Sequence, residues 1–395
     1  MDDGFAGRLA SLMAERGLGV LAVARRVPCD KALISRIAAG KQRPSAQIAH
    51  RLDDVLEAGG ELARLATRPV PHIPALDLPQ IAPDADLYDR ITRAVGTPAR
   101  VDLPVIEWLE HTLAEHRRVE DTLGARPLLA LVRAQLSAVT TFTRAAPGPL
   151  TDRLVDLAAQ YAQFLAWMCI ETRNHAAGLA WYDRAHDWAV QAGDANMAAT
   201  TLSMKAHLAW SVGDPQRCIR MGEAARWHPE RTTPGVQGMA AQMTARGHAL
   251  AGEEDPSHAL LDDAQALIGR ASEHPEDEPP WMYFYGETWF TLQRGMAELH
   301  LGNWRAAAEL LAAGLAALPE SYRRDRAWYA ACLAHAHAEA GDAEAAGAVA
   351  ARFAADITAV NSYARGELLT TARLLTRKGA RQGEDIKEAL GPQGH

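Results

Sequence analysis

The chain of 395 residues lacks the features that mark a membrane protein or a disulfide-stabilised protein. No uninterrupted apolar stretch reaches the ~18 residues of a membrane span, and the N-terminus has neither the basic nor the apolar region of a signal peptide. We therefore expect a cytoplasmic protein with no membrane contact. The cysteines are far apart and form no CxxC pair, which argues against a zinc site and a disulfide framework. They are Cys29, Cys169, Cys218 and Cys332.

Motifs that carry catalytic chemistry are also missing. The chain has no Gly-rich phosphate loop, no GxSxG and no HExxH. His335 and His337 are two positions apart, so on a helix they would face different directions and make a poor metal pair. We expect no enzyme activity, no cofactor and no bound metal.

β-Branched and aromatic residues are sparse, and alanine dominates the apolar fraction of 48%. Alanine loses no side-chain entropy in a helix, so this composition predicts an all-α fold. Short Gly, Pro and Asp turns separate the helical segments, whereas one stretch is rich in proline. The predicted parts are a compact helical domain at 1–66, a linker at 67–86, a long helical domain at 87–378 and a flexible tail at 379–395.

The net charge of −8 conceals an uneven distribution. Residues 1–70 carry 11 Lys and Arg against 8 Asp and Glu, a net of +3, whereas residues 71–395 carry 30 against 41, a net of −11. Within residues 16–51 the only acidic residue is Asp30, and the net charge there is +7. A basic patch at one end of an acidic protein is typical of a small DNA-reading domain on a body that does not bind DNA.

The basic region also has the pattern of two helices joined by a turn. In residues 20–39, Ala24 supplies a small residue where the helices would cross, Ile34 and Ile37 would bury the inner face, and Asp30 would cap the second helix. The segment ISRIAAGKQRPS resembles the helix-turn-helix of the lambda repressor and Cro family. Val20 and Pro28 depart from the pattern of that family. Val20 suggests weak binding to DNA, and Pro28 suggests an altered turn between the two helices.

This resemblance implies the roles of individual side chains. It assigns base-edge contacts to Lys31, Ala32, Ser35 and Arg36, with Arg36 an equally good candidate for a phosphate contact. It assigns contacts with the DNA backbone to Lys41, Arg43 and Arg25. Base contacts would choose the sequence, whereas phosphate contacts would supply affinity and salt dependence.

A repeat pattern follows in the long helical domain. Gly295 precedes a turn at Gly302. After that turn, small residues alternate with large apolar ones at spacings that suit a pair of packed helices. Similar turns occur at positions 173, 213, 252, 302 and 341. The pattern resembles the tetratricopeptide repeat, which implies a helical solenoid with a concave binding face. The alternative is a helical array without repeats, in which Gly-Asp merely ends helices. The residues that carry the pattern are Trp304, Ala307, Leu311, Gly314 and Pro319.

Aromatic residues are densest between positions 281 and 290. Trp281, Tyr283, Tyr285 and Trp289 are candidates for the wall of a ligand pocket. The alternative is that they anchor a helix in the core.

The whole layout resembles regulators of high-GC Gram-positive bacteria that join a helix-turn-helix domain to a tetratricopeptide-like helical domain. This resemblance implies a transcriptional regulator that binds a double-stranded DNA operator as a homodimer and responds to a peptide or small-molecule effector. The alternative is a scaffold that regulates a partner protein and binds little DNA.

Overall fold

The computed structural model describes residues 5–27, 29–42, 44–66, 85–146 and 148–391. These residues form helices and no strand, which confirms the all-α prediction. They belong to two compact units that divide between residues 82 and 83. No helix in the described ranges is long and apolar enough to cross a membrane.

The N-terminal unit packs short helices around one apolar core that includes Leu9, Ile34 and Leu52. Asp53 caps the last helix, because its buried carboxylate accepts hydrogen bonds from the backbone N–H groups of Gly60 and Leu62 at 2.5 and 2.7 Å. The helices are α1 (Phe5–Glu15), α2 (Val20–Arg26), α3 (Lys31–Ala38), α4 (Ala46–Val55) and α5 (Glu61–Ala66). The two helices that the sequence predicts within residues 20–39 are α2 and α3.

The predicted linker lies mostly outside the described residues, and its last two positions belong to the first helix of the second unit. The helices of the second unit are α6 (Ala85–Gly96), η1 (Pro98–Arg100), α7 (Leu103–Leu123), α8 (Leu129–Ala145), α9 (Gly148–Glu171), α10 (His175–Ala192), α11 (Ala195–Ser211), α12 (Pro215–Ala225), η2 (Pro229–Arg231), α13 (Pro234–Leu250), α14 (Glu254–Glu273), η3 (Pro275–Asp277), η4 (Pro280–Met282), α15 (Glu287–Leu301), α16 (Trp304–Ala317), α17 (Arg323–Glu339), α18 (Ala343–Val360), α19 (Ser362–Arg377) and α20 (Gln382–Leu390).

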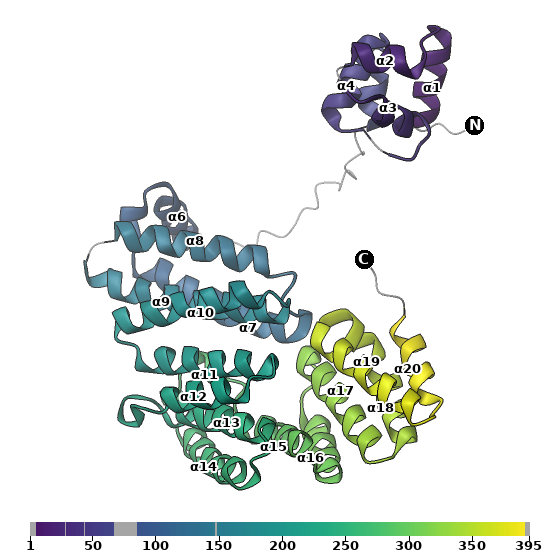
Figure 1. Ribbon diagram of the computed structural model, residues 1–395. Coiled ribbons are helices and arrows are strands. Elements are labelled where there is room, and N and C mark those ends of the chain that lie inside the picture. The colour runs from purple at the N-terminus through teal and green to yellow at the C-terminus, as the bar shows by residue number, and fades with distance from the viewer. Residues whose placement is uncertain (1–4, 28, 43, 67–84, 147, 392–395) are drawn as a thin grey trace. The chain divides into compact units, whose positions relative to one another are not determined.

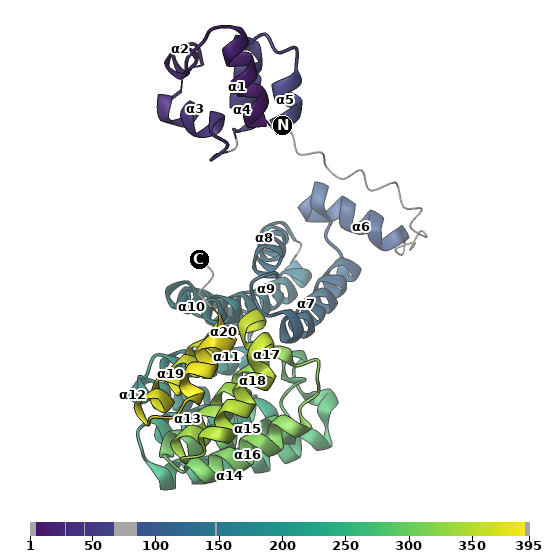
Figure 2. The same cartoon turned by 90° about the vertical axis from the view of Figure 1, so that its right-hand side faces the viewer.

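Consecutive helices of this unit pack as pairs joined by short turns, from α9 with α10 to α19 with α20. The first helices of successive pairs also contact one another, in the order α11, α13, α15, α17 and α19. Figure 1 shows the pairs following a curved path that brings α17 back beside α7, and these two helices are in contact. Figure 2, in which α17–α20 face the viewer, shows these helices stacked on α15 and α16.

Glycine positions explain the close packing of one pair. Gly302 ends α15 in the left-handed conformation, at φ 84°, and its N–H bonds to the carbonyls of Glu298 and Leu299. Gly295 lies where α15 crosses α16, and a Cβ there would come within 2.8 Å of Leu311 Cγ. These are two of the glycines on which the repeat pattern was based.

The prediction of a flexible tail from residue 379 is wrong for residues 382–390, which form α20. Ile386 and Leu390 are four positions apart, so they share one face of this helix, and both are buried against the preceding helices. Arg365 on α19 donates hydrogen bonds to the carbonyls of Leu390 and Gly391 at 2.6 and 3.0 Å. The polar composition of the tail concealed this short apolar face.

Candidate functional site

The N-terminal unit holds its α2–α3 pair by apolar contacts from both helices. Val23 and Ala24 on α2 are buried, as are Ile34 and Ile37 on α3. Asp30 caps α3, and its carboxylate accepts a hydrogen bond from the N–H of Ala32 at 3.0 Å. The cap and the buried residues together fix which face of α3 points outward.

The outward face of α3 carries the side chains that the sequence assigned to base contacts. Lys31, Ala32, Ser35 and Arg36 are all exposed, opposite the buried isoleucines. Arg36 Nε donates to Gln42 Oε1 at 2.8 Å, which directs this guanidinium toward the loop after α3. That orientation suits a phosphate contact at least as well as a base contact.

The predicted backbone contacts lie on both sides of α3. Arg25, at the end of α2, and Lys41, in the loop after α3, are exposed. Arg43 lies outside the described residues. No acidic side chain in the described ranges forms an ion pair with Arg25, Lys31 or Lys41, so their charges are free to meet an anion.

Other basic residues of this unit are used within it. Arg16 pairs with Glu57 at 2.6 Å, and Arg8 pairs with Glu61 at 2.9 Å and with Glu15 at 3.3 Å. Arg25, Lys31 and Lys41, on and beside α3, are therefore among the basic residues whose charge is not used within the described part of the unit.

Residues 5–66 match the family model of the helix-turn-helix domain. The match covers α1–α5 and includes every exposed residue discussed above. No curated protein matches the chain. The helix-turn-helix domain is therefore the part of the molecule that relates it to a known family.

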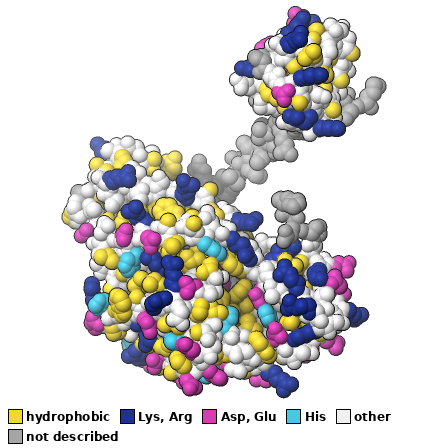
Figure 3. All heavy atoms as spheres, in the orientation of Figure 1, with side chains coloured by type: hydrophobic (Ala, Val, Ile, Leu, Met, Phe, Trp, Pro, Cys, Tyr) yellow, Lys and Arg dark blue, Asp and Glu magenta, His cyan; other side chains and the backbone are white. Residues whose placement is uncertain are grey.

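The second unit contains a partly open cavity of about 170 Å³. Its walls come from α7, from the first helices of successive pairs (α9, α11, α13, α15 and α17) and from the segment around η4. Figure 3 shows hydrophobic side chains gathered in the hollow at the middle of this unit. Five tryptophans line the cavity, namely Trp167, Trp210, Trp281, Trp289 and Trp328.

The aromatic cluster contributes to this cavity and to the core at once. Trp281, Tyr283 and Trp289 line the cavity, whereas Tyr285 does not. Tyr285 is buried and packs against Trp289, with the ring centroids 4.4 Å apart and the ring planes tilted by 46°. Trp281 donates through Nε1 to the hydroxyl of Thr200 at 3.1 Å.

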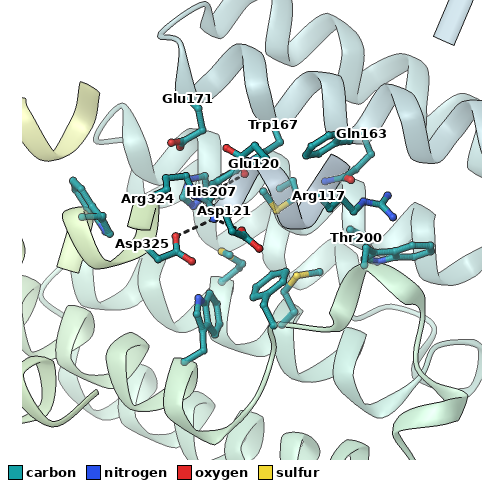
Figure 4. A pocket seen from close by; sticks show the side chains of 18 of the residues that line it. Arg117, Glu120, Asp121, Gln163, Trp167, Glu171, Thr200, His207, Arg324 and Asp325 are labelled. Atoms are coloured by element: carbon teal, nitrogen blue, oxygen red, sulfur yellow. Dashed lines mark hydrogen bonds and ion pairs between the residues drawn. The ribbon is translucent and has the colours of Figure 1, made fainter. Parts of the chain in front are cut away.

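At one end of the cavity, Arg324 on α17 forms ion pairs with three carboxylates. Its guanidinium lies 3.0 Å from Glu120, 3.1 Å from Asp121 and 2.9 Å from Asp325. Figure 4 shows Arg324 among these groups, with Arg117 on the side of Gln163 and Thr200. We call Arg324 and its three carboxylates the Arg324 cluster.

Burial perturbs the titration of this cluster. It raises the pKa of Glu120 to about 8 and that of Asp121 to about 6, although the charge of Arg324 acts in the opposite direction. Burial lowers the pKa of Arg324, but Asp325, Glu120 and Asp121 outweigh it, so the pKa is raised. One guanidinium cannot neutralise several buried carboxylates, so some of them hold protons at neutral pH.

Two other buried arginines line the cavity without any ion pair among the described residues, Arg117 and Arg246. Arg117 lies 5.9 Å from the ring centroid of Phe164 and 5.7 Å from that of Trp281. Burial lowers its pKa to about 10, although Tyr283, Tyr161 and Asp156 raise it.

Sequence reasoning missed these charged residues. Adjacent acidic residues on a helix ordinarily face solvent, but the side chains of Glu120 and Asp121 are buried. Trp167 and Trp210 also line the cavity, although they lie far in the chain from the aromatic residues at 281–290. One usable signal was present, since Arg117, Glu120 and Asp121 share a helix face with the apolar Leu113.

Proposed function

We propose that the protein is a sequence-specific, DNA-binding transcriptional regulator that acts in the cytoplasm. The observation that carries this proposal is the outward face of α3. It presents Lys31, Ala32 and Ser35 with no acidic partner, inside a region that matches the helix-turn-helix family model. Such a helix fits the major groove, where short polar side chains reach base edges and flanking basic residues meet phosphates.

The protein would bind DNA as a homodimer, with one helix-turn-helix domain from each chain. A single domain of this size buries too little surface to give a regulator its specificity. The two helix-turn-helix domains of one dimer would read two half-sites, so we expect an operator with inverted or direct repeats.

The helical domain would mediate dimerisation and sense a ligand or partner. Its paired helices, the close crossing at Gly295 and the left-handed Gly302 support a tetratricopeptide-like repeat. Its cavity supports a sensing role, because the wall is rich in aromatic and apolar side chains and its arginines pair with carboxylates or lie against aromatic rings.

Selection of bound sequences from a random double-stranded DNA library by the full chain tests this proposal. We expect one enriched motif for the wild type and none for Ser35→Glu, which places a negative charge against the bases. The proposal is wrong if the wild type enriches no motif, or if Ser35→Glu enriches the same one.

A further inference from the structure

Arg246 on α13 is a buried cation that has no counter-ion in the described part of the chain. It is 4% exposed, and its guanidinium carbon lies 4.2 Å from the ring centroid of Trp210. Its Nη1 lies 2.9 Å from His207 Nδ1, and its Nε has no hydrogen-bond partner among the described residues. In the same cavity Arg324 has three carboxylate partners, so the lack of one at Arg246 needs an explanation.

The neighbours of Arg246 supply no negative charge. Burial and the adjacent arginine lower the pKa of His207 to about 3, so this imidazole is neutral and accepts a hydrogen bond from Arg246. Burial and the same arginine lower the pKa of His300 to about 4, and this ring accepts from Trp210 Nε1 at 3.1 Å. An isolated buried charge is costly, and burial lowers the pKa of Arg246 itself.

The surroundings of Arg246 indicate what would compensate this charge. Met204, Met239, Met243 and Trp328 line the same cavity and form a wall that is apolar and aromatic. A guanidinium pairs with a carboxylate through two parallel hydrogen bonds. The cavity of about 170 Å³ is similar in size to a cavity of roughly 150 Å³ that admits benzene.

We propose that this cavity binds a small organic monocarboxylate with an aromatic or branched apolar body, whose carboxylate pairs with Arg246. This inference rests on the proposed sensing role of the helical domain and names the chemical class of the effector. Arg324 would not attract a further anion, because its guanidinium already pairs with three carboxylates. Arg117 is a weaker candidate, because two aromatic rings, Phe164 and Trp281, already face its guanidinium, whereas Arg246 has only Trp210. The carboxylate therefore lies at the Arg246 end, with the apolar body against the methionines and tryptophans.

The experiment measures thermal stabilisation and calorimetric binding of the full chain with benzoate, phenylacetate, indole-3-acetate and isovalerate. Each acid is compared with its neutral amide. We expect at least one acid to bind, and its amide to bind at least about tenfold more weakly, because a charge-assisted pair is lost. If none of the four acids binds at millimolar concentration, or if acid and amide bind equally, the proposal is wrong.

Variants then locate the anion. Arg246→Met should lose at least about tenfold in affinity for the acid, whereas Arg220→Met, at an exposed position on α12, should bind as the wild type does. Arg246→Met should also melt at or above the wild-type temperature without ligand, since it removes an uncompensated buried charge. A lower melting temperature with unchanged acid binding would assign Arg246 a structural role instead.

A gel shift on the same preparations keeps the two proposals separate. Loss of acid binding with intact operator binding overturns the ligand class alone. Acid binding without any sequence-specific DNA binding overturns the regulator proposal alone.

Discussion

Arg324 on α17 donates a hydrogen bond to Asp121 on α7 across 3.1 Å, although 203 positions separate them in the chain. Both side chains are buried, and Tyr283 donates to the second oxygen of the same carboxylate at 2.5 Å. This contact joins the beginning of the helical array to a helix near its end. It therefore helps to close the cavity that the array surrounds.

Replacing Arg324 should destabilise the helical domain strongly. Arg324→Met leaves buried carboxylates without their cation, and we expect the free energy of unfolding to fall by about 3–5 kcal/mol. The adjacent Arg323 pairs with Asp356 at a half-exposed site, so Arg323→Met should cost at most about 1 kcal/mol. Urea unfolding followed by circular dichroism measures both, and equal losses would contradict a special role for Arg324.

The raised pKa of Glu120 predicts that stability falls as the pH rises. The folded state holds a proton up to about pH 8, whereas the ordinary glutamate value is 4.5. The contribution of Glu120 to the free energy of unfolding is fully present below about pH 4.5 and is lost as the pH rises through about 8. Between these values the free energy of unfolding falls by at most about 1.4 kcal/mol per pH unit.

Glu120→Gln should make this slope shallower by up to about 1.4 kcal/mol per pH unit, because the amide does not titrate. The part that remains comes from Asp121, Asp156 and Glu171, because burial raises their pKa values too. Glu115→Gln, at an exposed position on the same helix, should keep the wild-type slope. Unfolding free energies measured from pH 5 to 8.5 test this, and a wild-type slope that persists in Glu120→Gln would refute it.

The crossing of α15 and α16 should not tolerate a methyl group at Gly295. A Cβ there meets Leu311 Cγ at 2.8 Å and the backbone N of the same residue at 3.1 Å. We expect Gly295→Ala to cost about 1–3 kcal/mol. Gly269, exposed on α14, has open space around it, so Gly269→Ala should stabilise by about 0.5–1 kcal/mol. Opposite signs for the two variants in thermal melts are the expected result.

Lys41 should contribute affinity rather than sequence choice. Lys41→Ala should weaken binding to all DNA sequences about equally and reduce the salt slope by about one unit. Arg64→Ala, at an exposed site on α5, should leave both unchanged. Titrations at several salt concentrations measure this, and an altered sequence preference in Lys41→Ala would move Lys41 to the base-reading face.

Arg36→Ala distinguishes the two roles left open for this residue. The hydrogen bond to Gln42 favours a phosphate contact, so we expect weaker binding with an unchanged motif. A relaxed preference at one base position in a library selection would instead show that Arg36 reads a base.

Short-range sequence patterns were enough to predict much of this molecule. Some features depend only on contacts within one or two turns of a helix, so they can be read directly from the sequence. They are the cap at Asp30, the buried isoleucines of α3 and the glycines at helix ends. The same patterns predicted the all-α fold and the separate basic head. The predicted repeat remains an interpretation, although its key glycines lie at a helix end and at a helix crossing.

The tertiary structure alone decided where the charged residues of the helical domain lie. Neither the three carboxylates around Arg324 nor the aromatic setting of Arg246 follows from local periodicity, because their neighbours come from helices far apart in the chain. The same holds for α20, whose two apolar residues gain a core only when α18 and α19 pack beside them. Helix formation depends on near neighbours, whereas burial depends on how the whole array curves.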